Sequence, residues 1–316
     1  MVKEVNTVKR KLALLLAVLL CVSCLAGCTG SNLLAMLPSQ EKEDSGEVVA
    51  GPVPEKMTAQ DLYGKLRYAV STKNVNVYTM DTCVDMMIAP FGIPVKGDLV
   101  NSMQVHKSAD PYGVNVLTTA ISRYMNQEQI TEAADYYRRE DGKLICYSCV
   151  ESMDYYERRE VDALPSEILS YYDIGSYMVI DPEELWLEEN MVMLDGREMY
   201  VLCYSLTGLQ QFGMTGDKQM DAALHELQMP VRFFVDAETF VPARREILLE
   251  DAEAFTRILL EYTVGSDYAH DLEFMDISVR EFKIVFHSFT YGEIEVPMIP
   301  KSVLDGCYGA QGNVGL

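Results

Sequence analysis

The feature that most constrains this fold is a long series of stretches in which apolar and polar residues alternate, each bounded by turn signals. The clearest is residues 75–89. One of its two predicted faces carries Tyr78, Met80, Val84, Met86 and Ile88, with Thr82 among them. Because side chains of a strand alternate between two faces, this strand has a dry face and a wet face. Such a strand is typical of an antiparallel sheet that is covered on one side.

Tight turns separate many of these stretches. Two Asp-Gly pairs, Asp141-Gly142 and Asp195-Gly196, predict two-residue hairpins, because such turns need positive φ at both central positions. A third hairpin is expected within residues 231–250, with 236–239 as its loop. Further strands are expected at 99–107, 114–124, 155–161, 279–292 and 293–300.

Helical spacing interrupts the strands in few places. A helix capped by Thr58 is expected to open the folded part, and three more are expected at 165–172, 216–228 and 251–263. About ten or eleven strands with few crossover helices predict the α+β class. We expect one strongly curved antiparallel sheet with helices packed on one side. A single domain, residues 57–316, would hold it.

The N-terminal segment has the layout of a secretory signal. Basic residues at 9–11 precede the apolar run 12–20, and small residues then lead to a cysteine. The tetrapeptide at 25–28 resembles the bacterial lipobox, and this resemblance implies cleavage between Gly27 and Cys28 and a diacylglycerol on the Cys28 thiol. A signal anchor that is never cleaved is the alternative. Residues 1–27 would then be the signal peptide, and the protein would be extracytoplasmic, anchored to the outer face of the bacterial cell membrane.

Residues 28–56 are rich in Ser, Gly, Pro and acidic residues and predict a flexible linker behind the lipidated N-terminus. The whole chain carries 26 Lys and Arg against 48 Asp and Glu, a formal net charge of −22. A surface this acidic repels phosphate backbones, so we expect no nucleic-acid partner.

Beyond Cys28, the part of the chain behind the signal holds five cysteines: Cys83, Cys146, Cys149, Cys203 and Cys307. An odd number is not a disulfide framework. Cys146 and Cys149 form a CxxC, but they lie in a predicted strand, where residues three apart point to opposite faces. No second CxxC accompanies them, so we expect neither a metal site nor a redox pair there.

The sequence contains no GxSxG, HExxH or phosphate-binding loop motif. Its four histidines, His106, His225, His270 and His287, are far apart. We therefore expect a protein that is not an enzyme and that needs no cofactor. By contrast the chain holds 18 methionines, whose unbranched, polarizable side chains adapt to guests of varied shape. Methionines that simply fill the core are the alternative.

The order of these features resembles the LolA-like superfamily of exported proteins, which includes LolA and LolB, the LppX/LprG lipoproteins and RseB-type sensors. The resemblance is greatest to its lipoproteins from Gram-positive bacteria. It rests on the lipobox, an acidic linker, one helix and then strands in order, including "REMYVLCYSL", "FFVDAETFVPARREILLE" and "YGEIEVPMIPKSVL", and covers about residues 58–304. It implies a half-open barrel with lid helices over an apolar cavity, which in some members holds acyl chains.

We therefore predict a lipoprotein that binds a lipid or an acylated molecule in an apolar cavity, without catalysis. The candidate cavity residues are every second residue of long strands: Tyr78, Met80, Val84, Met86, Tyr200, Leu202, Tyr204, Ile284 and Phe286. Choosing the other face of a strand would move its set by one residue. The alternative function is a cell-surface interaction or envelope-sensor module with a packed core, which contacts a partner protein of the cell envelope.

Overall fold

The structure is a computed structural model. It describes residues 48–90, 95–124, 127–173, 181–212, 218–251, 255 and 275–312.

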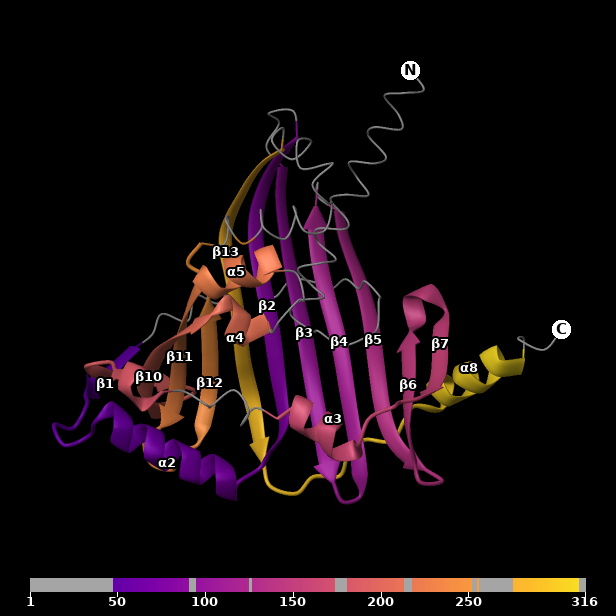
Figure 1. The fold of residues 1–316 in the computed structure, drawn as a ribbon, viewed down its shortest axis with the longest axis horizontal. Helices are drawn as coiled ribbons and strands as arrows, with labels where there is room; N and C mark the ends of the chain where they lie inside the picture. The colour runs from indigo at the N-terminus through magenta and orange to yellow at the C-terminus, as the bar shows by residue number, and fades with distance from the viewer. Residues whose placement is uncertain are drawn as a thin grey trace.

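One antiparallel sheet of 13 strands dominates the described part of the chain (Figure 1). Its first half is a meander of six strands: β2 (Val75–Pro90), β3 (Val95–Ala109), β4 (Tyr112–Tyr124), β5 (Gln127–Glu140), β6 (Lys143–Val150) and β7 (Tyr155–Glu160). Its second half contains β8 (Trp186–Leu187), β9 (Asn190–Leu194), β10 (Arg197–Thr207), β11 (Gln228–Asp236), β12 (Pro242–Leu248) and β13 (Met275–Tyr291). The short β1 (Val48–Pro52) pairs with β9, and β13 pairs with β2, which joins the two halves.

The predicted faces of β2 are confirmed. Tyr78, Met80, Thr82, Val84 and Met86 are at most 4% exposed. The residues between them are all half-buried. Alternation therefore assigned every described side chain of this strand from position 78 to 87 to the correct face, because only one face is fully covered. The side chain of Ile88 lies outside the described residues.

The two Asp-Gly hairpins are confirmed as well. Asp141 and Gly142 have φ of 48° and 80°, and Asp195 and Gly196 have φ of 52° and 76°. Positive φ at both central positions gives these turns the twist of the strands they join. The hairpin between β11 and β12 also forms, and its loop is held by the Asp236 carboxylate, which accepts hydrogen bonds from the backbone N–H groups of Glu238 and Thr239 at 3.1 and 2.8 Å.

Helices lie on both faces of the sheet. Those of the described part are α2 (Ala59–Thr72), α3 (Pro165–Tyr171), α4 (Gly208–Phe212), α5 (Lys218–Glu226) and α8 (Lys301–Gly312). As expected, Thr58 caps α2: its hydroxyl accepts a hydrogen bond from the N–H of Asp61 at 3.1 Å. In Figure 1, α2, α3, α4 and α5 lie in front of the sheet, and α8 lies beside β7. We call the face on which α2, α3 and α5 pack the inner face, and the opposite face the outer face.

The class, α+β with one large antiparallel sheet, is confirmed, but several expectations were wrong in detail. The sheet has 13 strands rather than ten or eleven, partly because β1 and β8 were not expected. It is open, with β1 and β7 at the two ends of the strand path, and Figure 1 does not show it strongly curled.

Three further expectations concern the chain ends and one helix. Residues 48–52, placed in the expected linker, form β1. Residues 293–300 form no strand and lead instead into α8. The helix expected at 251–263 lies almost wholly outside the described residues, and so do the signal segment and linker residues 28–47.

Two apolar layers hold the helices. On the inner face, Leu62 and Leu66 of α2 and Leu224 of α5 are no more than 1% exposed and join the large cluster formed by the strands. On the outer face, Val303 and Cys307 of α8 pack in a separate cluster on β5 and β6, of which Tyr136, Ile145, Tyr147 and Cys149 are the buried members. The close packing of α8 on the outer face requires a glycine at position 306, because a Cβ there would lie 2.5 Å from the ring of Tyr156 in β7.

Candidate functional site

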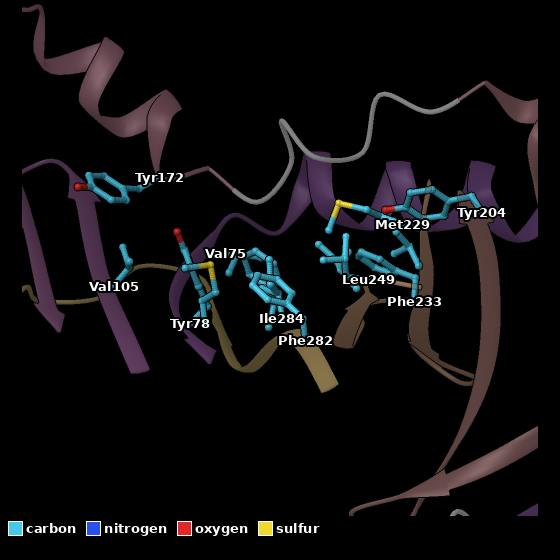
Figure 2. Close-up of a cluster of buried hydrophobic side chains, with 14 of the residues drawn as sticks. Val75, Tyr78, Val105, Tyr172, Tyr204, Met229, Phe233, Leu249, Phe282 and Ile284 are labelled. Atoms are coloured by element: carbon cyan, nitrogen blue, oxygen red, sulfur yellow. The ribbon is translucent and has the colours of Figure 1, made fainter. Parts of the chain in front are cut away.

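The nine predicted cavity residues lie together on the inner face. They come from β2, β10 and β13, and none is more than 6% exposed. All belong to one continuous apolar cluster, of which Figure 2 shows Tyr78, Ile284 and Tyr204 with their neighbours. The structure therefore brings together residues that are up to 208 positions apart in sequence, as Tyr78 and Phe286 show by packing their rings 6.1 Å apart. That these side chains line a ligand cavity stays a prediction.

Strand register explains the assembly. Ile284 pairs with Thr82 and Phe286 pairs with Met80, so β13 and β2 present their inner rows side by side. Two strands from which the sequence analysis took no cavity residue, β11 and β12, lie between β13 and β10. They contribute Val231, Phe233 and Ile247, each at most 1% exposed. The alternation within β11 could have identified Val231 and Phe233.

A buried cation also belongs to this face. The Arg245 side chain is 0% exposed and its Nε donates a hydrogen bond to the Tyr204 hydroxyl at 3.1 Å. Its guanidinium lies 5.3 Å from the centre of the Phe286 ring, within the range of a cation–π interaction. Sequence reasoning missed this residue, because the tandem Arg244-Arg245 does not reveal which arginine faces inward.

The inner face becomes more polar toward β5, β6 and β7. The Ser148 hydroxyl donates to the Asp135 carboxylate at 2.5 Å, and the Cys146 thiol lies 3.8 Å from the same oxygen. Burial, followed by the negative charge of Asp135, raises the pKa of Cys146 to about 11. The thiol is therefore neutral near pH 7, which is the opposite of what a nucleophilic or metal-binding cysteine needs.

The CxxC expectation about geometry is confirmed. Cys146 belongs to the inner cluster and Cys149 to the outer one, so the sheet separates the two thiols. Within the described part of the chain, no disulfide joins any two of the five cysteines behind the signal. Among the described residues, no three His, Cys, Asp or Glu side chains are arranged to hold a metal ion.

Two buried polar side chains stand in the middle of the apolar face. Thr82 is 1% exposed and Asn101 is 5% exposed, and the two residues pair across β2 and β3. Within the described part of the chain, neither the Thr82 hydroxyl nor the Asn101 Oδ1 has a hydrogen-bond partner. Thr82 was placed on this face from the sequence, whereas Asn101 was not singled out.

A groove runs along the exposed side of α2. It has a volume of about 870 Å³, and its lining includes Lys56, Lys65, Tyr68, Lys73 and Phe240. The Lys65 ammonium lies 4.2 Å from the centre of the Phe240 ring, and Tyr68 is 72% exposed. This combination of exposed aromatic and basic side chains contrasts with the acidic chain as a whole.

The proposed anchoring residues lie outside the structural description. Gly27 and Cys28 belong to the segment before Val48, so the described residues do not test cleavage or lipidation. In the part of the chain that is described, no helix combines the length and the apolarity needed to cross a bilayer.

Comparison with known proteins gives similarity of structure only. No protein-family model matches the chain, and no curated protein sequence matches it. The structure is similar to LprF from Mycobacterium bovis at 13% identity, over 79% of this chain and 99% of that one, with a TM-score of 0.37. It is also similar to a putative outer membrane lipoprotein-sorting protein domain from Vibrio parahaemolyticus at 9% identity, over 80% of this chain and 98% of that one, with a TM-score of 0.24.

A third similar structure is a LolA superfamily protein from Nitrosomonas europaea, at 11% identity over 78% of this chain and 97% of that one, with a TM-score of 0.19. The structural match to LprF and to LolA superfamily proteins agrees with the resemblance found in the sequence.

Proposed function

We propose that this chain is an extracytoplasmic lipoprotein that holds a lipid or an acylated molecule against the inner face, without catalysing a reaction. A diacylglycerol on Cys28 would anchor it to the outer face of the bacterial cell membrane. In this proposal the ligand lies between the inner face of the open sheet and the helices α2, α3 and α5 that pack on it.

The observation that supports the proposal is the character of the inner face. The nine candidate residues belong to one apolar cluster, which contains methionines: Met80 and Met86 are candidates themselves, and Met103 packs against the cluster. Burying a methylene contributes about 0.8 kcal/mol, so an acyl chain of about ten carbons could bind with several kcal/mol left after association costs. Methionines can repack around such a guest.

The chemistry of the described polar groups fits a holding role. The inward thiol of Cys146 is neutral, and the inward cation Arg245 is engaged by Tyr204. The Asp135 carboxylate lies beside the Cys146 thiol, but burial, followed by this negative charge, raises the pKa of that thiol instead of favouring the nucleophilic thiolate. That the protein is not an enzyme stays a prediction.

Native mass spectrometry tests the proposal. Residues 28–316 with Cys28→Ser, which lack the proposed anchor, would be produced in a bacterium and purified without detergent, and their mass measured before and after solvent extraction. We expect an adduct that extracts as lipid. A mass equal to that of the bare chain, unchanged after incubation with membrane lipids, would exclude a carrier role.

Anchoring has its own test. Cys28→Ala in the full chain is expected to move the protein from the detergent phase to the aqueous phase in a Triton X-114 partition. Cys24→Ala is the matched control, because that cysteine would leave with the signal. Equal partition of both variants would contradict lipidation at Cys28.

The second candidate function is an interaction module, and the α2 groove is the observation that favours it. Within the described residues, Lys56, Lys65 and Lys73 form no ion pair, whereas most other lysines and arginines do. A photo-crosslinker at position 68 would capture an acidic envelope protein in cells if this function holds. The same group at position 308, which is also exposed but lies on α8, is the control.

A further inference from the structure

The unbonded pair Thr82 and Asn101 indicates which ligand the inner face fits. A buried polar atom without a hydrogen bond costs about 1–3 kcal/mol, and native proteins contain few such atoms. Here two occur on directly paired residues of neighbouring strands. Side chains that face each other across two strands have Cβ atoms roughly 4.5–5.5 Å apart, so one small polar group can reach both.

The surroundings of the pair are apolar. On one side Met80 pairs with Met103, and on the other Val84 pairs with Leu99. Beyond Asn101, the next residue in the same row is Ala120, whose side chain is a single methyl group. A flexible pair of methionines and a small alanine border the polar pair, and such side chains can repack around a guest.

The buried polar side chains of the outer face differ from this pair because they form ion pairs. Asp81, Arg123 and Arg244 each have one unbonded buried atom, but another atom of the same side chain is ion-paired: Asp81 with His287 at 2.9 Å, Arg123 with Asp98 at 2.8 Å and Arg244 with Glu246 at 2.6 Å. The Thr82 hydroxyl has no such second atom.

We infer that Thr82 and Asn101 form a polar subsite for a hydrogen-bond donor on the apolar chain of the ligand, either a hydroxyl or an amide N–H. The donor is required because Asn101 Oδ1 only accepts hydrogen bonds, whereas the Thr82 hydroxyl can both donate and accept. A plain ester or hydrocarbon would leave Asn101 Oδ1 unbonded. This inference rests on the proposed function, since it names the class of lipid that the inner face prefers.

Three probes of equal chain length test it: methyl palmitate, which has no donor, N-methylpalmitamide, which has an N–H, and monopalmitoylglycerol, which has hydroxyls. Their dissociation constants would be measured for residues 28–316 with Cys28→Ser. We expect at least one donor probe to bind about tenfold or more tightly than methyl palmitate, which corresponds to about 1.4 kcal/mol. The comparison between the two donor probes shows whether the hydroxyl or the amide is recognised.

Substitutions connect the preference to the pair. Thr82→Val and Asn101→Leu, which keep the branching and the number of heavy atoms of each side chain, are expected to remove the preference, and Thr82→Ser is expected to keep it because the hydroxyl remains. Ser102→Ala with Thr119→Val is the matched control, since these paired residues lie on the other face of β3 and β4. A preference that survives both Thr82→Val and Asn101→Leu would overturn the subsite.

Two other outcomes are distinguishable. If all three probes bind equally, the subsite is wrong while the carrier proposal stands; if none binds, both fail. The ligand-free variants Thr82→Val and Asn101→Leu are also expected to unfold at the same temperature as the parent or higher, because an unbonded polar group has been removed. A lower unfolding temperature of both would mean that the pair serves the fold, and would likewise overturn the inference.

Discussion

The two faces of the sheet use the same strands but are built differently. On the inner face, side chains from β2, β3 and β10 to β13 merge into one apolar cluster with α2, α3 and α5. On the outer face, apolar side chains form two smaller clusters, one of them beneath α8. This face also carries ion pairs, such as that between Arg123 and Asp98. On the outer face Asp81, Arg123 and Arg244 each form an ion pair, whereas on the inner face the buried Thr82 hydroxyl and Asn101 Oδ1 have no hydrogen-bond partner within the described residues. This difference indicates that the inner face, and not the outer one, is suited to a guest.

The largest expected effect concerns a side chain at the centre of the inner face. Phe233→Ala should lower the free energy of unfolding by roughly 3–5 kcal/mol, because Phe233 is 1% exposed and its loss leaves a cavity. Urea denaturation measures it. Ile130→Ala, on the outer side of β5 and 44% exposed, is the control and should cost far less. If both variants lost the same free energy of unfolding, the inner face would not be more tightly packed than the outer face.

The second prediction uses one buried thiol on each face. Burial raises the pKa of Cys146 and of Cys149 to about 11, whereas an unfolded thiol titrates near 8.5. The folded chain therefore keeps protons that the unfolded chain releases. This contribution is complete below about pH 8.5 and is lost as pH rises toward about 11, by up to about 2 kcal/mol per thiol at about pH 10.

Denaturation at a series of pH values between about 8 and 10 measures this loss. Cys146→Ala, which removes the inward thiol, and Cys149→Ala, which removes the outward one, should each make the free energy of unfolding less dependent on pH, by similar amounts. If only one of the two has an effect, the faces differ in how well they exclude water. If neither has, burial does not hold these thiols protonated.

The third prediction concerns the attachment of α8 to the outer face. Gly306→Ala should cost about 1–3 kcal/mol of stability, because the added Cβ would lie 2.5 Å from the Tyr156 ring. Gly309→Ala is the matched control on the same helix: its Cβ would meet nothing within 4 Å, so it should be neutral or stabilise the helix slightly. Thermal unfolding of both variants measures the difference, and a harmless Gly306→Ala would mean that α8 is not held tightly against β7.

The smallest expected effect is the loss of one outer ion pair. Arg123 contacts Glu128 at 2.8 Å, and the Glu128 side chain is 36% exposed. Glu128→Gln should cost only about 0.2–1 kcal/mol, because water screens such pairs. The cost should shrink further in high salt, and denaturation at two salt concentrations checks it. A cost that salt leaves unchanged would show that the outer face excludes water here.

Much of the strand pattern could be predicted from sequence because it is local. The alternation in β2 and the two Asp-Gly turns depend on neighbouring residues only, and each was placed correctly. By contrast α8 was missed: its sequence contains three glycines and no strong capping signal, so it depends on contacts of Val303 and Cys307 with distant strands. The two-residue β8 gave no signal of its own.

The site divides in the same way. All nine candidate residues lie on the inner face. Alternation makes that choice for β2, but β10 is buried on both faces, since Val201 and Cys203 are at most 3% exposed, so alternation did not decide there. Asn101 was not found, because its importance comes from standing opposite Thr82, and the register between β2 and β3 decides that pairing.

By itself the sequence determined the class of the fold, the positions of its turns and which side chains share a face of each strand. Only the tertiary structure decided that β13 pairs with β2, so that strands nearly 200 residues apart meet in the middle of the sheet. It also decided that the unbonded polar pair lies within an apolar surface. The physical reason is that alternation acts through the local geometry of the chain, whereas strand order depends on which distant apolar rows can be buried together.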